Sequence, residues 1–391
     1  MIPFSEAQAL FPYTQALRRD FHRHPELGFQ EVRTSGIIAK ELRELGLQVF
    51  SPIAKTGVVA LVQGTRPDPV VMLRFDIDAL PIHEQTGVEY ASQTPGLMHA
   101  CGHDGHAAIG LTVAKLLYAH RTEFVGTVKL VFQPAEEGLG GAEAMIKEGV
   151  LQNPRPKCAL GVHIWNRKPL GELGIAVGPV LAGAGKFKIT IKGKGGHGAA
   201  PHLSVDPVLA SAQIISVAQS IVSRNVDPQK AAVITFAGIH GGEAFNVIPH
   251  QVEMNGTLRF FEPEVGQMLY QRFKQVVLSV AEGMGCQAEM EVNDLTPAVI
   301  NDEAVTACVL RAAQKVLPDQ KIDSHGYITM GSEDFAFFQE ELPSTYIFVG
   351  SSNAERGLTY GPHHPKFDFD EAVLPMAAVL TANAALEMLQ L

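Results

Sequence analysis

The stretch "PVVMLRFDIDALP", residues 69–81, decides the fold. It is a continuous apolar run between turn-forming prolines, which is typical of a strand buried on both faces of a sheet. The run ends in two acidic residues, Asp76 and Asp78. Further runs of the same kind, such as "GTVKLVF" and "KCALGVHIW", alternate along the chain with helical patterns. Because strands and helices alternate, we predict an α/β domain with a doubly wound, mostly parallel sheet.

The pattern changes near residue 183. "GKFKITIK" alternates apolar and polar residues, as a half-exposed strand does, and the segments after it follow the β-α-β-β-α-β order of a ferredoxin-like module. The α/β alternation resumes from about Pro297. A chain of 391 residues is also long for a single core. We therefore predict a discontinuous catalytic domain, residues 1–182 and 296–391, with an inserted ferredoxin-like α+β domain at residues 183–295.

The composition excludes several classes of protein. Hydrophobic residues make up 46% of the chain and charged residues 18%, which is typical of a folded globular protein. The net charge of −10 argues against a nucleic-acid partner, which requires a basic surface. No run of about 18 apolar residues and no signal-peptide pattern is present, so we expect no membrane partner. The four cysteines are widely spaced, which favours a reducing, cytoplasmic location over a disulfide framework.

Polar side chains follow several predicted strands, and the carboxyl ends of such strands are where sites form in open α/β sheets. "MHACGHDGH" carries Cys101 and His103, which are separated by one residue and can face the same way. A thiolate and an imidazole suit zinc-like ions. Glu136 and Glu137 follow a second strand, and His163 lies at the end of a third.

Three interpretations of the Cys101 segment remain open on its residues alone. It can be a metal site, a polar turn, or a thiol nucleophile helped by His103 and Asp104. The neighbouring glutamates favour the metal site. Adjacent side chains diverge, so one of Glu136 and Glu137 can bind metal while the other acts as a base toward metal-activated water.

These motifs together resemble a known family, the bimetallic amidohydrolases. This family includes hippurate hydrolases, indole-acetyl-amino-acid hydrolases, N-acyl-amino-acid deacylases and related metallocarboxypeptidases. The resemblance covers nearly the whole chain in order. It is carried by "RRDFHRHPELGFQE", "RFDIDALPIHE", "MHACGHDGHAA", "VFQPAEEGLGGAEAMI", "GVHIWN", "GKGGHGAAPH", "GGEAFNVIP", "MNGTLR", "MGSEDFAFF" and "HHPKFDFDE".

The resemblance implies two divalent metal ions per subunit, with Zn, Mn, Co or Ni as candidates. It implies the metal ligands Cys101, His103, Glu137, His163 and His363. Cys101 is expected to bridge the two ions. The family's His-x-Pro spacing favours His363 over His364. Relatives in the wider family have a histidine ligand where this chain has Asp76, so we expect Asp76 near the site and Asp78 as its supporting carboxylate.

The resemblance also gives roles to residues of the inserted domain, which it implies is a lid that often dimerises. His197 is expected to stabilise the oxyanion, often across a dimer interface. Asn246 and Arg259 are expected to bind the carboxylate end of the substrate, and the Arg259 guanidinium can do so with two parallel hydrogen bonds. We therefore expect a homo-oligomer that forms through the lid domain.

The function that follows is metal-dependent hydrolysis of the amide bond of N-acyl-L-amino acids. A metal-activated water attacks, Glu136 is the general base, and the products are a carboxylic acid and a free amino acid. The alternative enzyme is a metallocarboxypeptidase that acts on short peptides. A non-catalytic metal-binding protein on the same scaffold is a third hypothesis, against which the presence of Glu136 counts.

Overall fold

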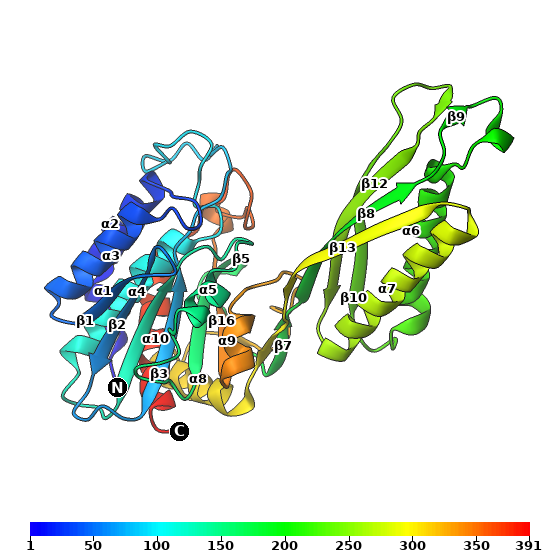
Figure 1. Ribbon diagram of the computed structural model, residues 1–391. Coiled ribbons are helices and arrows are strands. Elements are labelled where there is room, and N and C mark those ends of the chain that lie inside the picture. Colours follow the sequence, from blue (N-terminus) through cyan, green and yellow to red (C-terminus); the bar gives the residue numbers. More distant parts are fainter. The chain divides into compact units, whose positions relative to one another are not determined.

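The computed structural model describes residues 1–391, except for the side chains of residues 294 and 295. The chain divides into two compact units, which are considered separately below (Figure 1). Unit 1 comprises Met1–Val180, Ile300–Ile328 and Asp334–Leu391. Unit 2 comprises Leu181–Val299 and Thr329–Glu333. No helix among the described residues combines the length and the apolar character that crossing a membrane requires.

Unit 1 is built on an eight-stranded sheet with the strand order β1-β2-β4-β3-β5-β16-β6-β15. Its strands are β1 (Gln48–Ile53), β2 (Gly57–Gln63), β3 (Val70–Asp76), β4 (Thr127–Gln133), β5 (Ala159–Pro169), β6 (Leu173–Gly174), β15 (Ile322–Asp323) and β16 (Ser344–Ser352). Strands β4, β3, β5 and β16 are parallel to one another, as predicted. Strand β1 was not predicted. It is a half-exposed antiparallel edge strand that contains Pro52, so it lacks the apolar run of a central strand.

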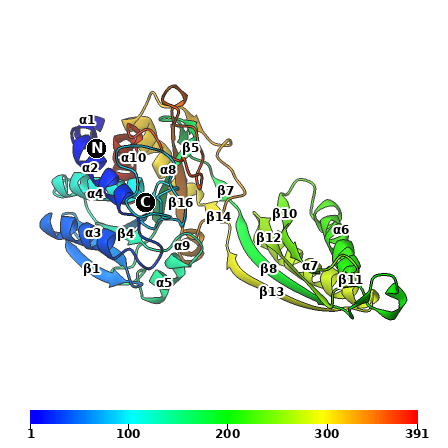
Figure 2. The ribbon, with the colours of Figure 1, turned by 90° about the horizontal axis from the view of Figure 1, so that it is seen from above.

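Helices cover both faces of this sheet. They are α1 (Phe4–Ala9), α2 (Phe11–Arg23), α3 (Val32–Glu44), α4 (His103–Ala119), α5 (Gly141–Lys147), α8 (Glu303–Val316), α9 (Ala336–Glu341) and α10 (Val373–Met388). Helix α10 packs against both α4 and α8, and these three helices cover the strands on one face, while the short helices α5 and α9 lie together on the other face (Figure 2). The sheet is therefore doubly wound, in agreement with the prediction.

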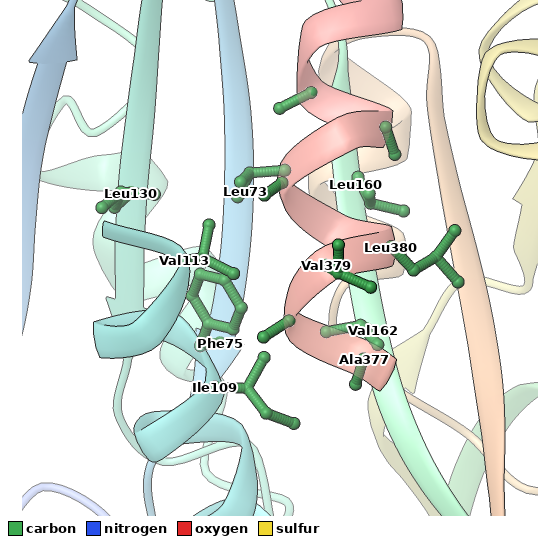
Figure 3. Close-up of a cluster of buried hydrophobic side chains, with 14 of the residues drawn as sticks. Leu73, Phe75, Ile109, Val113, Leu130, Leu160, Val162, Ala377, Val379 and Leu380 are labelled. Carbon is green, nitrogen blue, oxygen red and sulfur yellow. The ribbon is translucent and has the colours of Figure 1, made fainter. Parts of the chain in front are cut away.

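The core of unit 1 fixes the position of helix α4. Ile109 and Val113 of α4 lie beside Phe75 of β3, while Leu380 of α10 points away from them on the other side of that helix (Figure 3). Burial of each such side chain contributes about 1.5–3 kcal/mol. Helix α4 is buried along almost its whole length and begins at His103. Core packing thus holds in place the helix that starts within the predicted metal motif.

Unit 2 contains a four-stranded antiparallel sheet with the order β10-β12-β8-β13. Its main elements are β8 (Gly183–Lys192), α6 (Pro207–Asn225), β10 (Ala232–His240), β12 (Gln251–Phe260), α7 (Pro263–Gly283) and β13 (Gln287–Thr296). Strand β9 (Gly196–His197) of this unit pairs with β11 (Val247–Ile248). Strand β7 (Gly178–Leu181) pairs with β14 (Val299–Asn301), and most residues of these two strands belong to unit 1. Phe187 and Ile189 of β8 pack with Phe273 of α7 in the core of unit 2. This sequence of elements is the predicted ferredoxin-like one.

Candidate metal centre

Three adjacent parallel strands bring the predicted site residues to one edge of the sheet. Asp76 at the end of β3 pairs with Gln133 at the end of β4. Arg74 pairs with Gly161 of β5, so His163 lies two residues further on, at the level of Asp76. The loop after β4, which carries Glu136 and Glu137, leaves the sheet at the same edge. These polar motifs therefore lie at the carboxyl ends of the strands, where they are expected from the sequence.

The five predicted ligands form two groups that share one residue. Cys101, His103 and His163 make up the first group, and Cys101, Glu137 and His363 make up the second. Within each group, the candidate ligand atoms all lie within 4.8 Å of one another. This arrangement fits two cations, with Cys101 among the residues that would hold each of them, since thiolate, imidazole and carboxylate are the usual ligands of such ions.

His103 is oriented by the backbone and the side chain of Asp78. Gly102, with φ of 96°, turns the chain between Cys101 and the start of α4. The His103 Nδ1–H then donates to the Asp78 carbonyl oxygen at 3.0 Å and to Asp78 Oδ1 at 3.1 Å. Its Nε2 is buried and has no hydrogen-bond partner among the described residues. An Nε2 that no other protein group occupies is available to a cation, and a carboxylate behind the imidazole is the usual support of a metal-binding histidine.

His163 is held in the same tautomer. Its Nδ1–H donates to the carbonyl oxygen of Ile164 at 2.6 Å, so Nε2 carries the lone pair. Nε2 lies 3.5 Å from Cys101 Sγ. Burial, aided by the neighbouring His106, lowers the pKa of His163 well below its ordinary value. A neutral imidazole in this tautomer can bind a cation through its Nε2 lone pair.

The structure separates the two adjacent histidines of the "HHP" motif. His363 Nε2 lies 3.1 Å from Glu137 Oε1, and hydrogen bonds with Cys101 and Glu137 raise the pKa of His363 to about 10. His364 instead stacks on Tyr360, with ring centroids 4.4 Å apart. His363 adopts a φ of 66°, and its N–H donates to the carbonyl oxygen of Ala100 at 2.7 Å. Of the two, His363 is therefore the one that faces the candidate centre.

The electrostatics of Cys101 argue against a cysteine hydrolase. Burial, with the Glu137 carboxylate nearby, raises the pKa of the Cys101 thiol. Nucleophilic cysteines have a lowered pKa. The Asp104 carboxylate, which would have to orient His103 in a thiol mechanism, instead accepts hydrogen bonds from Arg18 at 2.9 Å and from His22 at 2.7 Å.

Asp76 and His106 form a separate buried pair behind the candidate ligands. The His106 Nδ1–H donates to Asp76, and His106 Nε2 accepts from the N–H of Ile164 at 2.9 Å. Both ring nitrogens of His106 are therefore engaged, although Asp76, His103 and His106 lie close enough together to hold an ion. Asp76 also binds the Arg74 guanidinium. We interpret this pair as support for β5 and its candidate ligand His163.

Glu136 lies in the loop between β4 and α5. A carboxylate oxygen of Glu136 lies within 4.8 Å of the ligand atoms of both His103 and Glu137. Glu137 is anchored from behind, because its backbone N–H donates to Asp78 Oδ2 at 3.0 Å. Glu137 thus lies among the candidate ligands and Glu136 lies beside them. This is the geometry that one metal-binding glutamate and one neighbouring base require.

The three predicted residues of the inserted domain all belong to unit 2. His197 on β9 pairs with Val247 on β11, and the N–H of Gly198 donates to the carbonyl oxygen of Asn246 at 2.8 Å. His197 and Asn246 therefore lie on adjacent segments. Arg259 lies at the other end of β12, opposite Ala184 of β8. It is half-buried, and burial lowers the pKa of its guanidinium.

Sequence reasoning gave no role to several buried charged residues around the centre. Arg18 and Arg74 are almost fully buried and paired with carboxylates, and Glu31 is fully buried. A signal for Arg74 was available, since it is the one charged residue inside the apolar run "VVMLRF" and a buried charge requires a partner.

Comparison with known proteins identifies the family. A model of peptidase family M20/M25/M40 matches residues 72–386. The chain belongs to this family and is a metal-dependent amidohydrolase. The hypothesis of a non-catalytic metal-binding protein is therefore not supported.

Several curated relatives match almost the entire chain. The chain is 42% identical over 383 residues to IAA-amino acid hydrolase ILR1-like 4 of Arabidopsis thaliana, with 96% of this chain and 85% of that protein covered. It is 40% identical to N-acetylcysteine deacetylase of Bacillus subtilis (strain 168), with 96% of each chain covered. It is 37% identical to thermostable carboxypeptidase 1 of Saccharolobus solfataricus, with 95% and 94% covered.

The fold also matches solved structures. The Bacillus subtilis YXEP protein, described as a dinuclear metal binding peptidase from the M20 family, superimposes with a TM-score of 0.85 and 36% identity. The match covers 98% of this chain and 99% of that one. The predicted α/β architecture with an inserted domain is therefore confirmed.

Proposed function

We propose that this protein hydrolyses the amide bond of N-acyl-L-amino acids to a carboxylic acid and a free amino acid. The observation that carries the proposal is the pair of donor groups that share Cys101, with Glu136 beside them. Relatives named as hydrolases of an amino-acid conjugate and of an N-acetylated amino acid support this substrate class.

Two divalent ions complete the site in this proposal. Cys101, His103 and His163 would hold one ion, and Cys101, Glu137 and His363 the other. When bound, the ions supply Lewis acidity toward the scissile carbonyl and acidify a water molecule. Zn, Mn, Co and Ni all suit a set of sulfur, nitrogen and oxygen donors.

The side chains of the protein then provide proton transfer and orientation. The Glu136 carboxylate takes a proton from the attacking water and delivers it to the leaving nitrogen. Asp78 keeps the proton of His103 on Nδ1, so that Nε2 stays free. His197 donates to the oxyanion. Asn246 and Arg259 bind the carboxylate of the amino acid, and they come from different subunits of the proposed oligomer, because Asn246 precedes one end of β12 and Arg259 lies at the other.

Replacement of the base tests this assignment. We expect Glu136→Gln to retain wild-type metal content and to lower kcat on N-acetyl, N-benzoyl or indole-acetyl amino acids by about 10²–10⁴-fold. The matched variant Glu137→Gln should lose metal, because it changes a candidate ligand. Steady-state kinetics and elemental analysis of both variants provide the measurements. Wild-type turnover by Glu136→Gln would show that another group is the base.

A carboxypeptidase that acts on short peptides is the second candidate, and the relative from Saccharolobus solfataricus favours it. Both reactions break an amide bond next to an amino acid with a free carboxylate. Dipeptides in the same substrate panel separate them. The proposal predicts a higher kcat/KM for N-acyl-amino acids, and a higher value for dipeptides would favour the carboxypeptidase.

We also propose that the chain self-associates through unit 2, the lid domain of the sequence prediction, and that it is a cytoplasmic protein. Strand β10 is an edge strand of its sheet, and Val208 and Leu209 of α6 are exposed apolar residues. Sedimentation equilibrium tests the association. The four buried, unpaired cysteines suit a reducing compartment.

A further inference from the structure

The segment "LGFQE", residues 27–31, contacts the loop that carries Glu136. The Glu31 side chain is fully buried. Its Oε1 accepts a hydrogen bond from the backbone N–H of Ala135 at 2.9 Å, and its Oε2 accepts from Thr56 Oγ1 at 2.6 Å. Both oxygens of this carboxylate are therefore committed to fixed partners, and one partner is the residue directly before Glu136.

Ala135 has an unusual backbone conformation. Its φ is 58°, in the left-handed region that residues other than glycine adopt only at a cost in free energy. Such a conformation persists when the surrounding structure determines it. A buried carboxylate that accepts from the Ala135 N–H supplies that constraint, because a hydrogen bond to a charged acceptor is stronger than one between neutral groups.

Two further contacts restrict the conformation of the same loop. A Cβ on Gly28 would lie 2.9 Å from Ala135 Cα, so only glycine fits at that position without a shift of the loop. On the other side of Glu136, the N–H of Glu137 donates to Asp78 Oδ2 at 3.0 Å. The general base thus lies between two residues whose backbone N–H groups are each held by a carboxylate.

We propose that Glu31 is a positioning residue for the hydrolytic reaction. It holds the backbone at Ala135 in the conformation that directs the Glu136 carboxylate toward the water and the leaving nitrogen. This inference rests on the proposed role of Glu136 as the general base. No substrate contact by Glu31 itself is involved.

The test compares two substitutions of Glu31. In Glu31→Gln, the amide oxygen can still accept from Ala135 and the amide nitrogen can donate to Thr56, so activity should stay within about 3-fold of wild type. Glu31→Leu has a similar size but no acceptor. Because a small misplacement of a catalytic group has a large effect on rate, kcat should fall by about 10- to 100-fold. KM and the metal content of Glu31→Leu should stay close to wild type.

A control separates positioning from plain loss of stability. Asp302 caps helix α8 by accepting from the N–H of Val305 at 2.9 Å, and it belongs to none of the candidate metal-binding groups. Asp302→Ala should lower Tm and leave kcat unchanged when assayed below its transition. A Glu31→Leu variant that behaves like Asp302→Ala would overturn the inference, as would equal losses of kcat in Glu31→Gln and Glu31→Leu.

Two additional variants keep the result decisive. If Glu31→Leu does not fold, Gly28→Ala displaces Ala135 from the other side, and it should lower kcat by a similar factor with unchanged KM. An unchanged kcat would overturn the inference.

Glu136→Gln in the same panel separates failure of the proposed base from failure of the positioning role of Glu31. Full turnover by Glu136→Gln means that the base is misassigned. An inactive Glu136→Gln beside a Glu31→Leu variant with wild-type kcat means that only the positioning role is wrong.

Discussion

Asp78 supports both parts of the candidate metal centre with one carboxylate. Its Oδ1 accepts from His103 Nδ1 at 3.1 Å, and its Oδ2 accepts from the N–H of Glu137 at 3.0 Å. One of these donors belongs to each of the two groups that share Cys101. A carboxylate behind a metal-binding histidine orients the ring and fixes its tautomer, so Asp78 links the geometry of the two groups.

Replacement of Asp78 by asparagine should weaken metal binding. The asparagine side chain has one acceptor oxygen, so it can serve His103 or Glu137 but not both in the same way. We expect the affinity for the ions to fall by about 10- to 100-fold, as measured by competition with a chelator. Asp370→Asn is the matched control, since Asp370 is also buried and accepts from Asn353 and Ala372. Equal affinity in the Asp78→Asn protein and the control would contradict this role.

The identities of the candidate ligands could be predicted from the sequence, and the hydrogen bonds that orient them could not. Motif spacing and the family resemblance point to Cys101, His103 and Glu137 directly. The contact between Glu31 and Ala135 joins residues that are 104 positions apart. No local sequence pattern predicts such a contact, because it depends on how α3, β2 and the loop after β4 pack together.

At the scale of elements, one buried arginine ties helix α2 to two segments of the centre. Arg18 is fully buried and binds Asp104 at 2.9 Å, Asp368 at 2.6 Å and Glu371 at 3.2 Å. Asp104 follows His103 at the start of α4. Asp368 and Glu371 lie between His363 and α10. The guanidinium thus neutralises carboxylates from two segments that carry candidate ligands, in a place that water does not reach.

Removal of this arginine should strongly destabilise unit 1. Arg18→Met removes the guanidinium from Asp104 and Asp368, while Glu371 keeps its pair with Arg19. Breaking a buried ion pair in this way costs about 3–5 kcal/mol. We expect a large drop in Tm by calorimetry. Arg19→Met is the control, because Arg19 is partly exposed and, among the described residues, forms an ion pair with Glu371 alone. Similar Tm values for the two variants would contradict this account of Arg18.

The contact between α1 and the end of α4 should depend on pH. Hydrogen bonds with Glu123 and with Glu6 raise the pKa of His120 above its ordinary value of 6.5. A raised pKa means that the protonated imidazole stabilises the fold below about pH 6.5, and that this contribution disappears as the pH rises through the folded-state pKa. The Tm difference between wild type and His120→Gln should therefore be larger at about pH 6 than at about pH 9. A constant difference would rule out this linkage.

For the whole molecule, the alternation of buried strands with helices was sufficient to predict a doubly wound sheet and an inserted ferredoxin-like module. The central strands β3, β4 and β5 carry long apolar runs that only a buried position explains. The edge strand β1 lacks such a run and was missed. Local composition thus predicts the parts of the fold that are buried on both faces, and edge strands depend on tertiary contacts that composition does not encode.

In the candidate site, too, some features follow from the sequence and others depend on tertiary contacts. Sequence alone left the choice between His363 and His364 to family spacing, and only the fold shows that His364 turns away to stack on Tyr360. The separation of the ligands into two groups around Cys101 is likewise a property of the folded chain, since it joins the loop after β4 to the segment before α10.

The most direct test of the central claim is metal removal followed by titration. The protein is stripped with a chelator, and Zn, Mn, Co or Ni is added back while the hydrolysis of N-acyl-amino acids and the bound metal are both measured. The account predicts a metal-free protein without activity, and recovery that saturates at two ions per chain. Full activity in the metal-free protein, or saturation at one ion, would contradict it.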